Sequence, residues 1–335
     1  MTRAELLNLG GSALNLKGPK ITGGAFGEGL TATGEVAVVN AHIDGALVLT
    51  AAKLRNRGRQ ALRLEGTVVS GSAFPDKLQA FGQVSTVGVR VGGALLLRGA
   101  KLSRRYGTAL DMDGGMVAGD AILDGLVAAG TVSAVNTHFG GQLSLERAKL
   151  SDRHGHALDL YGPELARDTC LTNLTAAGAI RFANAHFLTD LSMSEASLTR
   201  PRGVALDIQS TRVDGNASFY NMTANGGADC SRAVIGGQLN FSCATLSRSD
   251  GHALDLEGIF VKGTAFLNEI QTTGEVRAPV AHFGQQLQFT GAVLHGTGKT
   301  SPELYGAEIT GDTIFNAVEA VGEVRAVNVH IRRRT

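Results

Sequence analysis

The sequence predicts an all-β protein, a right-handed four-sided parallel β-solenoid of about 14 coils. The tag "ALDL", or a close variant of it, recurs in a 48-residue repeat, beginning at Ala13, Ala61, Ala109, Ala157, Ala205 and Ala253. Apolar or small residues also form i/i+2 pairs at regular spacing throughout each repeat, and helical periodicity is nowhere sustained. A constant step without slippage indicates that neighbouring copies stack directly on one another.

Each i/i+2 pair predicts a three-residue strand with both ends facing inward. Successive pairs lie five or six residues apart, which leaves two or three residues for a corner. Four sides close a 22-residue coil, and the second coil has four extra residues at one corner, which makes it a 26-residue coil. The repeat from Gly251 to Gly298 contains these pairs: Leu254/Leu256, Ile259/Val261, Ala265/Leu267, Ile270/Thr272, Val276/Ala278, Ala281/Phe283, Leu287/Phe289 and Ala292/Leu294.

The constant register predicts a single β-solenoid domain over residues 1–335. Each 48-residue unit contains two coils, and the last unit is partial. The predicted units lie near 13–60, 61–108, 109–156, 157–204, 205–252, 253–300 and 301–331.

Composition limits the possible functions. The formal net charge of +1 gives no global argument for nucleic acid as a partner. No run approaches 18 apolar residues, and the start "MTRAELLNLGG" has no apolar signal core, so we expect no membrane partner. The three cysteines form no CxxC motif, which fits a reduced cytoplasm. No GxGxxG follows a strand and opens a helix, and we expect no cofactor.

Several phrases carry a family resemblance. The units "GAVLH" and "AHFGQ" resemble pentapeptide-repeat proteins, whose right-handed four-sided helix places a Leu or Phe centrally on each side. The longer "GEVRAPVAHFGQQLQFTGAVL" resembles actinobacterial repeat proteins built on GEVRL…A.IGGQL, which are often loosely labelled oxidoreductases. Here the spacings of five and six alternate, which departs from a strict pentapeptide. The rival fold is the three-sided β-helix of polysaccharide lyases, and four evenly spaced pairs per coil favour the four-sided alternative.

The residue between each inward pair points outward, so outward residues form columns along each face. On the "ALDL" face, Asp207, Asp229 and Asp255 are consecutive. Like charges in adjacent strands are destabilising. Asp229 lies in "GGADCSR", where other copies read "GEVR"-like, and this local departure suggests a selected feature. The trio could bind a divalent cation or act as an acid/base pair; alternatively, Arg181 and Arg277 clamp its ends and the middle is solvated. Replacing Asp229 with Ser abolishes activity or metal binding under the first interpretation only.

The next face carries recurring histidines. His138, Glu164 and His186 form a His-Glu-His triplet of residue types that can ligate zinc. Parallel neighbours on a flat ladder converge poorly on a tetrahedral centre, because the two histidines are about 10 Å apart along the backbone. Imidazole–carboxylate pairing is the favoured interpretation, which makes this face sensitive to pH near neutrality.

The third face begins with an apolar stripe of five outward residues on consecutive coils. Contiguous exposed apolar residues mark interfaces, whereas isolated ones do not. The stripe therefore predicts a homo-oligomer or a protein partner; cover by a corner loop or by the N-terminal residues is the alternative. Uncovered coil ends, with unpaired strand edges, predict end-to-end pairing as a second route. The stripe contains Phe26, Val48, Phe74, Leu96 and Ile122.

The extended corner carries one arginine-rich loop per repeat. Because these loops lie about 10 Å apart, their arginines could bind the successive charges of an anionic polymer. The alternative is that the loops are a row of solvated turns without a ligand. We call the row the arginine ridge, and it contains Arg57, Arg105, Arg153, Arg200 and Arg248.

Three functions follow as hypotheses. The first is a non-catalytic interaction or scaffold solenoid of the bacterial cytoplasm that works through its outer faces. The second is an enzyme or metal-dependent ligand binder centred on the Asp207, Asp229 and Asp255 column. The third is topoisomerase protection, which the pentapeptide-repeat resemblance implies for some relatives through mimicry of DNA. The net charge of +1 and the arginine ridge count against that mimicry.

Overall fold

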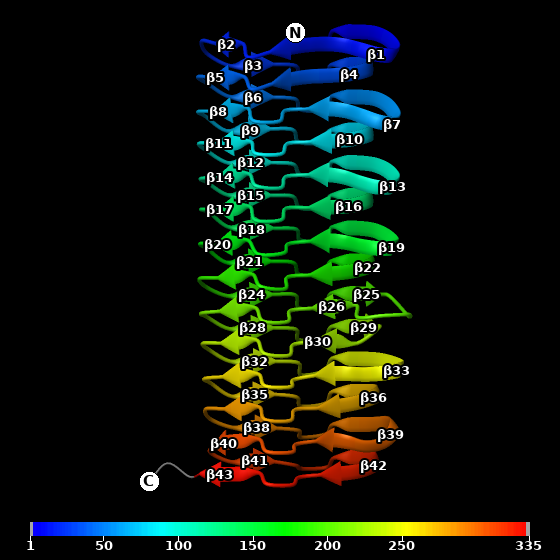
Figure 1. Cartoon of the computed structure of the whole chain (residues 1–335), viewed down its shortest axis with the longest axis vertical. Helices are drawn as coiled ribbons and strands as arrows, with labels where there is room; N and C mark the ends of the chain where they lie inside the picture. Colours follow the sequence, from blue (N-terminus) through cyan, green and yellow to red (C-terminus); the bar gives the residue numbers. More distant parts are fainter. Residues whose placement is uncertain (1–2, 333–335) are drawn as a thin grey trace. The chain divides into compact units, whose positions relative to one another are not determined.

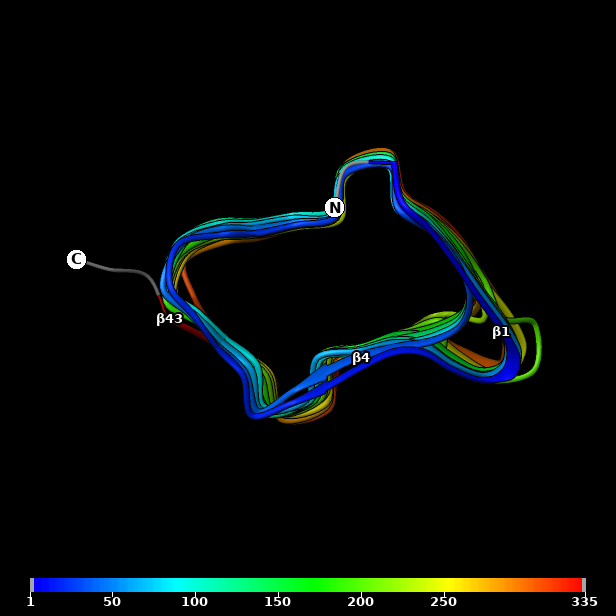
Figure 2. The same ribbon diagram turned by 90° about the horizontal axis from the view of Figure 1, so that it is seen from above.

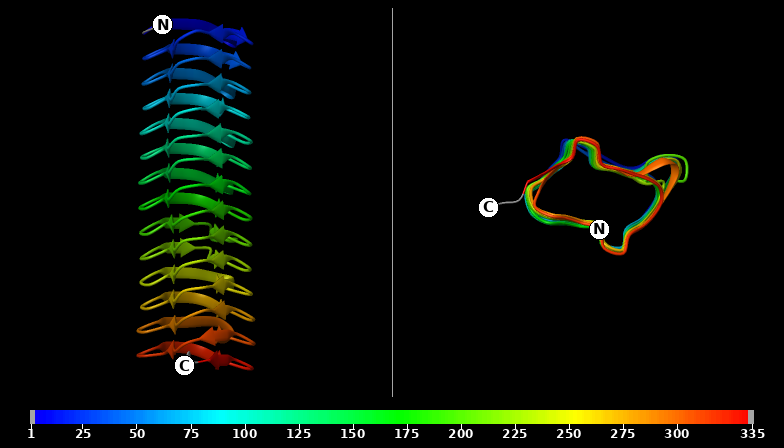
Figure 3. Two further views of the ribbon diagram at one scale, coloured as in Figure 1. Left: turned by 90° about the vertical axis from the view of Figure 1, so that its left-hand side faces the viewer. Right: turned by 90° about the horizontal axis from the view of Figure 1, so that it is seen from below.

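The computed structural model describes residues 3–332, apart from the side chains of residues 153, 154, 249 and 297–300. The chain divides into two compact units, Met1–Cys170 and Leu171–Thr335. All strand pairs are parallel, and the described residues form strands and turns without a helix. Each unit is a β-solenoid built from strands of three sheets, A, B and C, as the stacked arrows of Figures 1 and 3 show.

Unit 1 stacks seven strands in each sheet, in chain order. Sheet A contains β1 (Glu5–Lys17), β4 (Thr31–Val39), β7 (Lys53–Arg63), β10 (Gln79–Ser85), β13 (Lys101–Asp111), β16 (Val127–Ser133) and β19 (Lys149–Asp159). Sheet B contains β2 (Lys20–Ile21), β5 (His42–Ile43), β8 (Val68–Val69), β11 (Arg90–Val91), β14 (Met116–Val117), β17 (His138–Phe139) and β20 (Glu164–Leu165). Sheet C contains β3 (Ala25–Phe26), β6 (Leu47–Val48), β9 (Ala73–Phe74), β12 (Leu95–Leu96), β15 (Ala121–Ile122), β18 (Leu143–Ser144) and β21 (Thr169–Cys170).

Unit 2 repeats this plan. Sheet A contains β22 (Thr175–Arg181), β25 (Ser197–Thr199), β26 (Leu206–Asp207), β29 (Thr223–Asn225), β30 (Ala228–Asp229), β33 (Thr245–Asp255), β36 (Gln271–Arg277), β39 (Val293–Glu303) and β42 (Glu319–Arg325). Sheet B contains β23 (His186–Phe187), β27 (Arg212–Val213), β31 (Val234–Ile235), β34 (Phe260–Val261), β37 (His282–Phe283), β40 (Glu308–Thr310) and β43 (His330–Arg332). Sheet C contains β24 (Leu191–Ser192), β28 (Ala217–Ser218), β32 (Leu239–Asn240), β35 (Ala265–Phe266), β38 (Leu287–Gln288) and β41 (Thr313–Ile314).

The predicted alternation of shorter and longer coils is confirmed within each unit. The first residues of the sheet B strands alternate between the two predicted coil lengths, from Lys20 to Glu164 in unit 1 and from His186 to His330 in unit 2. Seven coils in each unit give about 14 in total. The coils of each unit trace a four-cornered outline in Figure 2.

Four sides correspond to three sheets because the strands of sheet A run through one corner. In every second coil the chain passes this corner at a glycine of positive φ, such as Gly34 (+112°), Gly82 (+135°) and Gly130 (+119°). A Cβ on Gly82 would lie 2.5 Å from the carbonyl oxygen of Asn56 in the coil before it. Only glycine tolerates both the backbone angle and this approach, which explains the recurring glycine of the "GEVR"-like phrase.

One stretch of unit 2 departs from this plan. There, the long strand is divided into β25 and β26 in one coil and into β29 and β30 in the next. Pro201 interrupts the first coil at the extended corner, because proline has no N–H to donate to a strand ladder. This region forms the green loop that projects outward from the coils in Figure 2.

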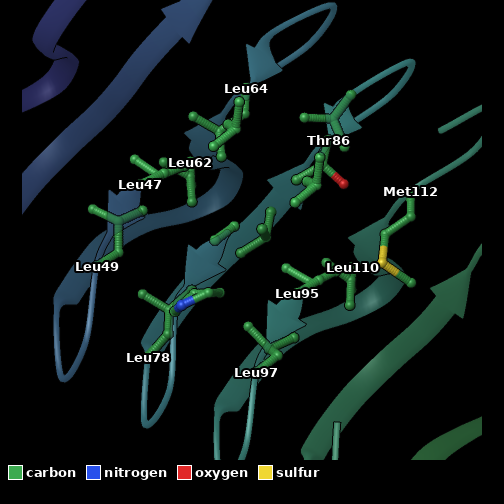
Figure 4. A pocket seen from close by; sticks show the side chains of 16 residues that line it. Leu47, Leu49, Leu62, Leu64, Leu78, Thr86, Leu95, Leu97, Leu110 and Met112 are labelled. Carbon is green, nitrogen blue, oxygen red and sulfur yellow. The ribbon is translucent and has the colours of Figure 1, made fainter. Parts of the chain in front are cut away.

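The core of each unit is made by inward residues that are almost inaccessible to solvent. The core of unit 2 is rich in phenylalanine, and the rings of Phe219 and Phe241 stack with centroids 4.6 Å apart. In unit 1, Leu and Val occupy most of these positions and leave an apolar cavity of about 40 Å³. Figure 4 shows its lining, in which Leu49, Leu78 and Leu97 face Leu64 and Met112.

Candidate functional site

The apolar stripe lies where the sequence predicts it, on sheet C of unit 1. The register places Phe26 beside Val48, Val48 beside Phe74, and Leu96 beside Ile122. Phe26 is 58% exposed, and the other four side chains are half-buried. The strand spacing of about 4.8 Å makes this a continuous row of apolar side chains rather than scattered ones.

The aspartate column also forms as predicted, within unit 2. Asp207 pairs with Asp229, and Asp229 pairs with Asp255, in strands β26, β30 and β33. Arg181 lies beside Asp207, and Arg277 beside Asp255, so an arginine flanks each end of the column.

These carboxylates accept hydrogen bonds from their own corners. The Oδ1 atoms of Asp207, Asp229 and Asp255 each accept the backbone N–H two residues later, at 3.0, 2.9 and 3.0 Å. Asp229 also accepts the Ser231 hydroxyl at 2.6 Å. Each aspartate thus ends a strand by holding the turn that follows it, which is a common role for Asp at turns.

Charged neighbours surround the last aspartate of the column. The Nε of Arg277 lies 3.3 Å from Asp255 Oδ1, and its guanidinium also contacts Glu257. His252 Nδ1 lies 2.9 Å from Glu275 Oε2. Burial raises the pKa of Asp255; Arg277 acts against that rise and Asp229 adds to it. The column is therefore half-buried and tied into a network of structural polar contacts.

Cys230 lies on the inner side of this column. Its side chain is fully buried, and burial, assisted by the three aspartates, raises its thiol pKa well above the ordinary value. A thiol held in its protonated form is a poor nucleophile. Cys230 therefore packs in the core rather than adding reactivity to the column.

The histidine face forms imidazole–carboxylate contacts. In unit 1, His138 Nδ1 lies 3.3 Å from Glu164 Oε1 in the next strand of sheet B. In unit 2, His282 Nδ1 lies 3.4 Å from Glu308 Oε2. The ring of His282 also stacks on Phe260 with centroids 4.8 Å apart. The pairing that the sequence analysis favours is therefore present on this face.

His186 belongs to unit 2 and contacts a residue that the column pattern did not identify. Its Nε2 lies 3.0 Å from Asp214 Oδ2, and Arg212 Nε lies 2.6 Å from Asp214 Oδ1. Slight burial acts to raise the pKa of Asp214, but the bonds from His186 and Arg212 outweigh it and lower that pKa. Among the described residues, no group of three or more His, Cys, Asp or Glu is placed to hold a metal ion.

The arginine ridge differs between the units. Arg57 and Arg105, in unit 1, are exposed, and the side chain of Arg153 lies outside the described residues. In unit 2, Arg200 Nη1 donates to the carbonyl oxygen of Val204 at 3.1 Å, and Arg248 Nε lies 3.3 Å from Asp250 Oδ1. The unit 2 arginines thus contribute to holding their own loops.

A polar groove beside the ridge is a feature that the sequence analysis missed. It has a volume of about 530 Å³ and is lined by Gly10, Gly11, Ser12, Glu35, Asn56, Arg59, Gln60, Gln83 and Arg104. Arg59 Nη1 donates to the carbonyl oxygen of Gly10 at 3.1 Å, and Arg104 donates to Gln83 Oε1. The signal available in the sequence was that Arg59 and Arg104 both lie in extended-corner segments, "LRNRGRQ" and "LSRRYGT", of successive repeats.

Comparisons with protein-family models, with curated proteins and with solved structures found no match. In the described part of the chain, no helix has the length and apolarity needed to cross a membrane.

Proposed function

We propose that this chain is a non-catalytic interaction solenoid and that the apolar stripe of unit 1 joins two copies of it. The observation that carries the proposal is the register of Phe26, Val48, Phe74, Leu96 and Ile122, one on each of five consecutive coils. A row of similar apolar side chains is complementary to itself under a twofold axis, which is the symmetry of most homodimers.

The surroundings of the stripe support an interface. Arg98 and Asp76 form an ion pair of 3.2 Å at the corner beside sheet C. Protein interfaces commonly combine an apolar centre with a polar rim. The self-bonded corners of the aspartate column support a structural rather than a catalytic role for those residues.

The oligomeric state tests this proposal. We expect the double variant Phe74→Asp, Leu96→Asp to be monomeric in multi-angle light scattering at a concentration where the parent chain is a dimer, because charges cannot be buried unpaired at the interface. The matched control, Val234→Asp with Phe260→Asp, changes two exposed residues of sheet B and should leave the mass unchanged. A monomeric parent chain, or a double variant of unchanged mass, would overturn the proposal.

A further inference from the structure

The extended corner of unit 1 concentrates positive charge on three consecutive coils. Segments 53–59 and 101–105 carry seven Lys and Arg residues, and neither these segments nor segment 79–83 between them contains Asp or Glu. The register pairs Lys53 with Gln79 and Gln79 with Lys101, so the three segments lie side by side. We call this surface the basic corner, and its cations are Lys53, Arg55, Arg57, Arg59, Lys101, Arg104 and Arg105.

The basic corner is accessible and hollowed. Six of its seven cations are exposed, and Arg104 is half-buried. The loops of β7 and β13 project on the right of Figure 1, with β10 between them. The polar groove of about 530 Å³ lies at this corner, with Arg59 and Arg104 in its lining. Its one acidic lining residue, Glu35, is paired with Arg63 at 3.4 Å.

Two aromatic rings are interleaved with these cations. Tyr106, next to Arg105 at the end of the loop, is 92% exposed. Phe81, on the intervening coil, is 37% exposed and lies 5.6 Å below the guanidinium of Arg55. Aromatic rings and guanidinium planes both provide surfaces on which nucleobases stack.

The charge balance of the whole chain conceals this surface. Residues 1–170 carry 18 Lys and Arg against 15 Asp and Glu, whereas residues 171–335 carry 13 against 15. The net charge of +1 averages over these two halves, so it does not describe the charge at one edge of unit 1. An electrostatic footprint is a local property, and a cluster of cations on one edge is sufficient for it.

We propose that the basic corner binds single-stranded nucleic acid with little sequence preference. The backbone phosphates pair with the arginines of the two loops, and bases stack on Tyr106 and on the Arg55–Phe81 pair. Gln60 and Gln83 also line the groove, but their amide groups donate to Glu65 Oε1 and Asp111 Oδ2, so we assign them no contact with the bases. Cations alone fit an acidic polysaccharide equally well; the exposed ring of Tyr106 beside the arginines favours a ligand with stacking bases.

Fluorescence anisotropy of a labelled 15-nucleotide oligothymidine, titrated with the full chain in 50 mM salt, tests the proposal. We expect Arg55→Gln, Arg57→Gln, Arg59→Gln to weaken binding by about tenfold or more, and to reduce the slope of log affinity against log salt by about 0.7 for each phosphate that is no longer neutralised. The control Arg90→Gln, Arg147→Gln, Arg167→Gln removes three exposed charges of unit 1 elsewhere and should stay within about threefold of the parent, since none of the three neutralises a phosphate.

A second arm separates stacking from charge. Tyr106→Ala should weaken oligothymidine binding by about fivefold or more with the salt slope unchanged, and Tyr106→Phe should restore it, because the ring and not the hydroxyl stacks. No binding by the parent chain, equal losses in the two arginine triples, or indifference to Tyr106→Ala would each overturn the proposal. Heparin binding that matches oligothymidine binding in every variant would assign the corner to acidic polysaccharides instead.

Discussion

Single aspartate and asparagine side chains determine how this chain turns its corners. Besides the three aspartates of the column, Asn240 Oδ1 accepts the N–H of Ser242, two residues later, at 2.8 Å. Others bond to the next coil: Asp124 Oδ1 accepts the N–H of Glu146 at 3.0 Å, and Asn268 Oδ1 accepts that of Thr290 at 2.9 Å. A short acceptor at a corner therefore either closes its own turn or ties two coils together. The aspartates that suggest a catalytic site in the sequence therefore have a local structural role, which is to hold the corners of the coils.

Two aspartates of unit 2 should show opposite dependence of stability on pH. The pKa of Asp255 is raised above 3.8, so its folded form holds the proton more tightly, and stability falls as pH rises from 3.8 through the folded pKa. The pKa of Asp214 is lowered, so its contribution is present above 3.8 and is lost as pH falls through the folded pKa.

Thermal unfolding between pH 2.5 and 6 checks these signs. The Tm of Asp255→Asn minus that of the parent should rise with pH, and the same difference for Asp214→Asn should become more negative. Asparagine keeps the Oδ1 acceptor, so the corner bond from Glu257 N–H is retained in Asp255→Asn. Parallel pH trends in the two variants would contradict this assignment.

At the scale of the strand, the corner of sheet A shows what periodicity alone does not predict. The i/i+2 pairs correctly predict four sides, because inward residues alternate with outward ones on each side. They do not indicate that β36 (Gln271–Arg277) continues through a corner, because that depends on the φ of +123° at Gly274. The recurring glycine is visible in the sequence, but the need for it comes from the neighbouring coil. There, the carbonyl oxygen of Arg248 would lie 2.4 Å from a Cβ on Gly274.

Replacing Gly82 with Ala should therefore destabilise unit 1 strongly. The new Cβ would meet the carbonyl oxygens of Asn56 at 2.5 Å and Arg59 at 2.8 Å, at a φ of +135°. We expect a loss of about 2 kcal/mol or more, which combines backbone strain with displacement of the extended corner. Gly88→Ala is the matched control, because its φ is +64° and its Cβ would have open space; it should cost about 1 kcal/mol. Equal urea midpoints for the two variants would refute the role of close approach.

At the scale of the whole molecule, the sequence predicts which residues stack in columns. It does not predict the contacts that column residues make with residues at the corners. The neighbours of Asp229 and of Phe74 follow from counting one coil along the sequence, and the structure confirms both registers. The contact between His186 and Asp214 joins one coil to the corner of the next, so no column contains it. The groove at Arg59 and Arg104 depends on side-chain directions at a corner, where the period of two no longer applies.

The cores of the two units also differ in the side chains that fill them. Val91 lines the cavity of unit 1, whereas the equivalent positions of later repeats carry Phe139 and, in unit 2, Phe187 and Phe283. Val91→Phe should fill the cavity and stabilise unit 1 by about 1 kcal/mol, because a cavity costs about 24 cal/mol per Å³. In a solenoid, each coil is stabilised mainly by its neighbours. Hydrogen exchange should therefore slow at the amides of residues 43–112 and remain unchanged at 182–289.

Ile235→Phe is the matched control for this variant. Ile235 occupies the same position in its coil as Val91, but that coil already contains the buried ring of Phe241, stacked on Phe219. Adding a second ring there should overpack the core and cost about 1–3 kcal/mol. A gain in stability in both variants would mean that phenylalanine is favoured at this position regardless of the space available. A loss in both would mean that the cavity lining cannot admit the ring, and that unit 1 is adapted to its smaller side chains.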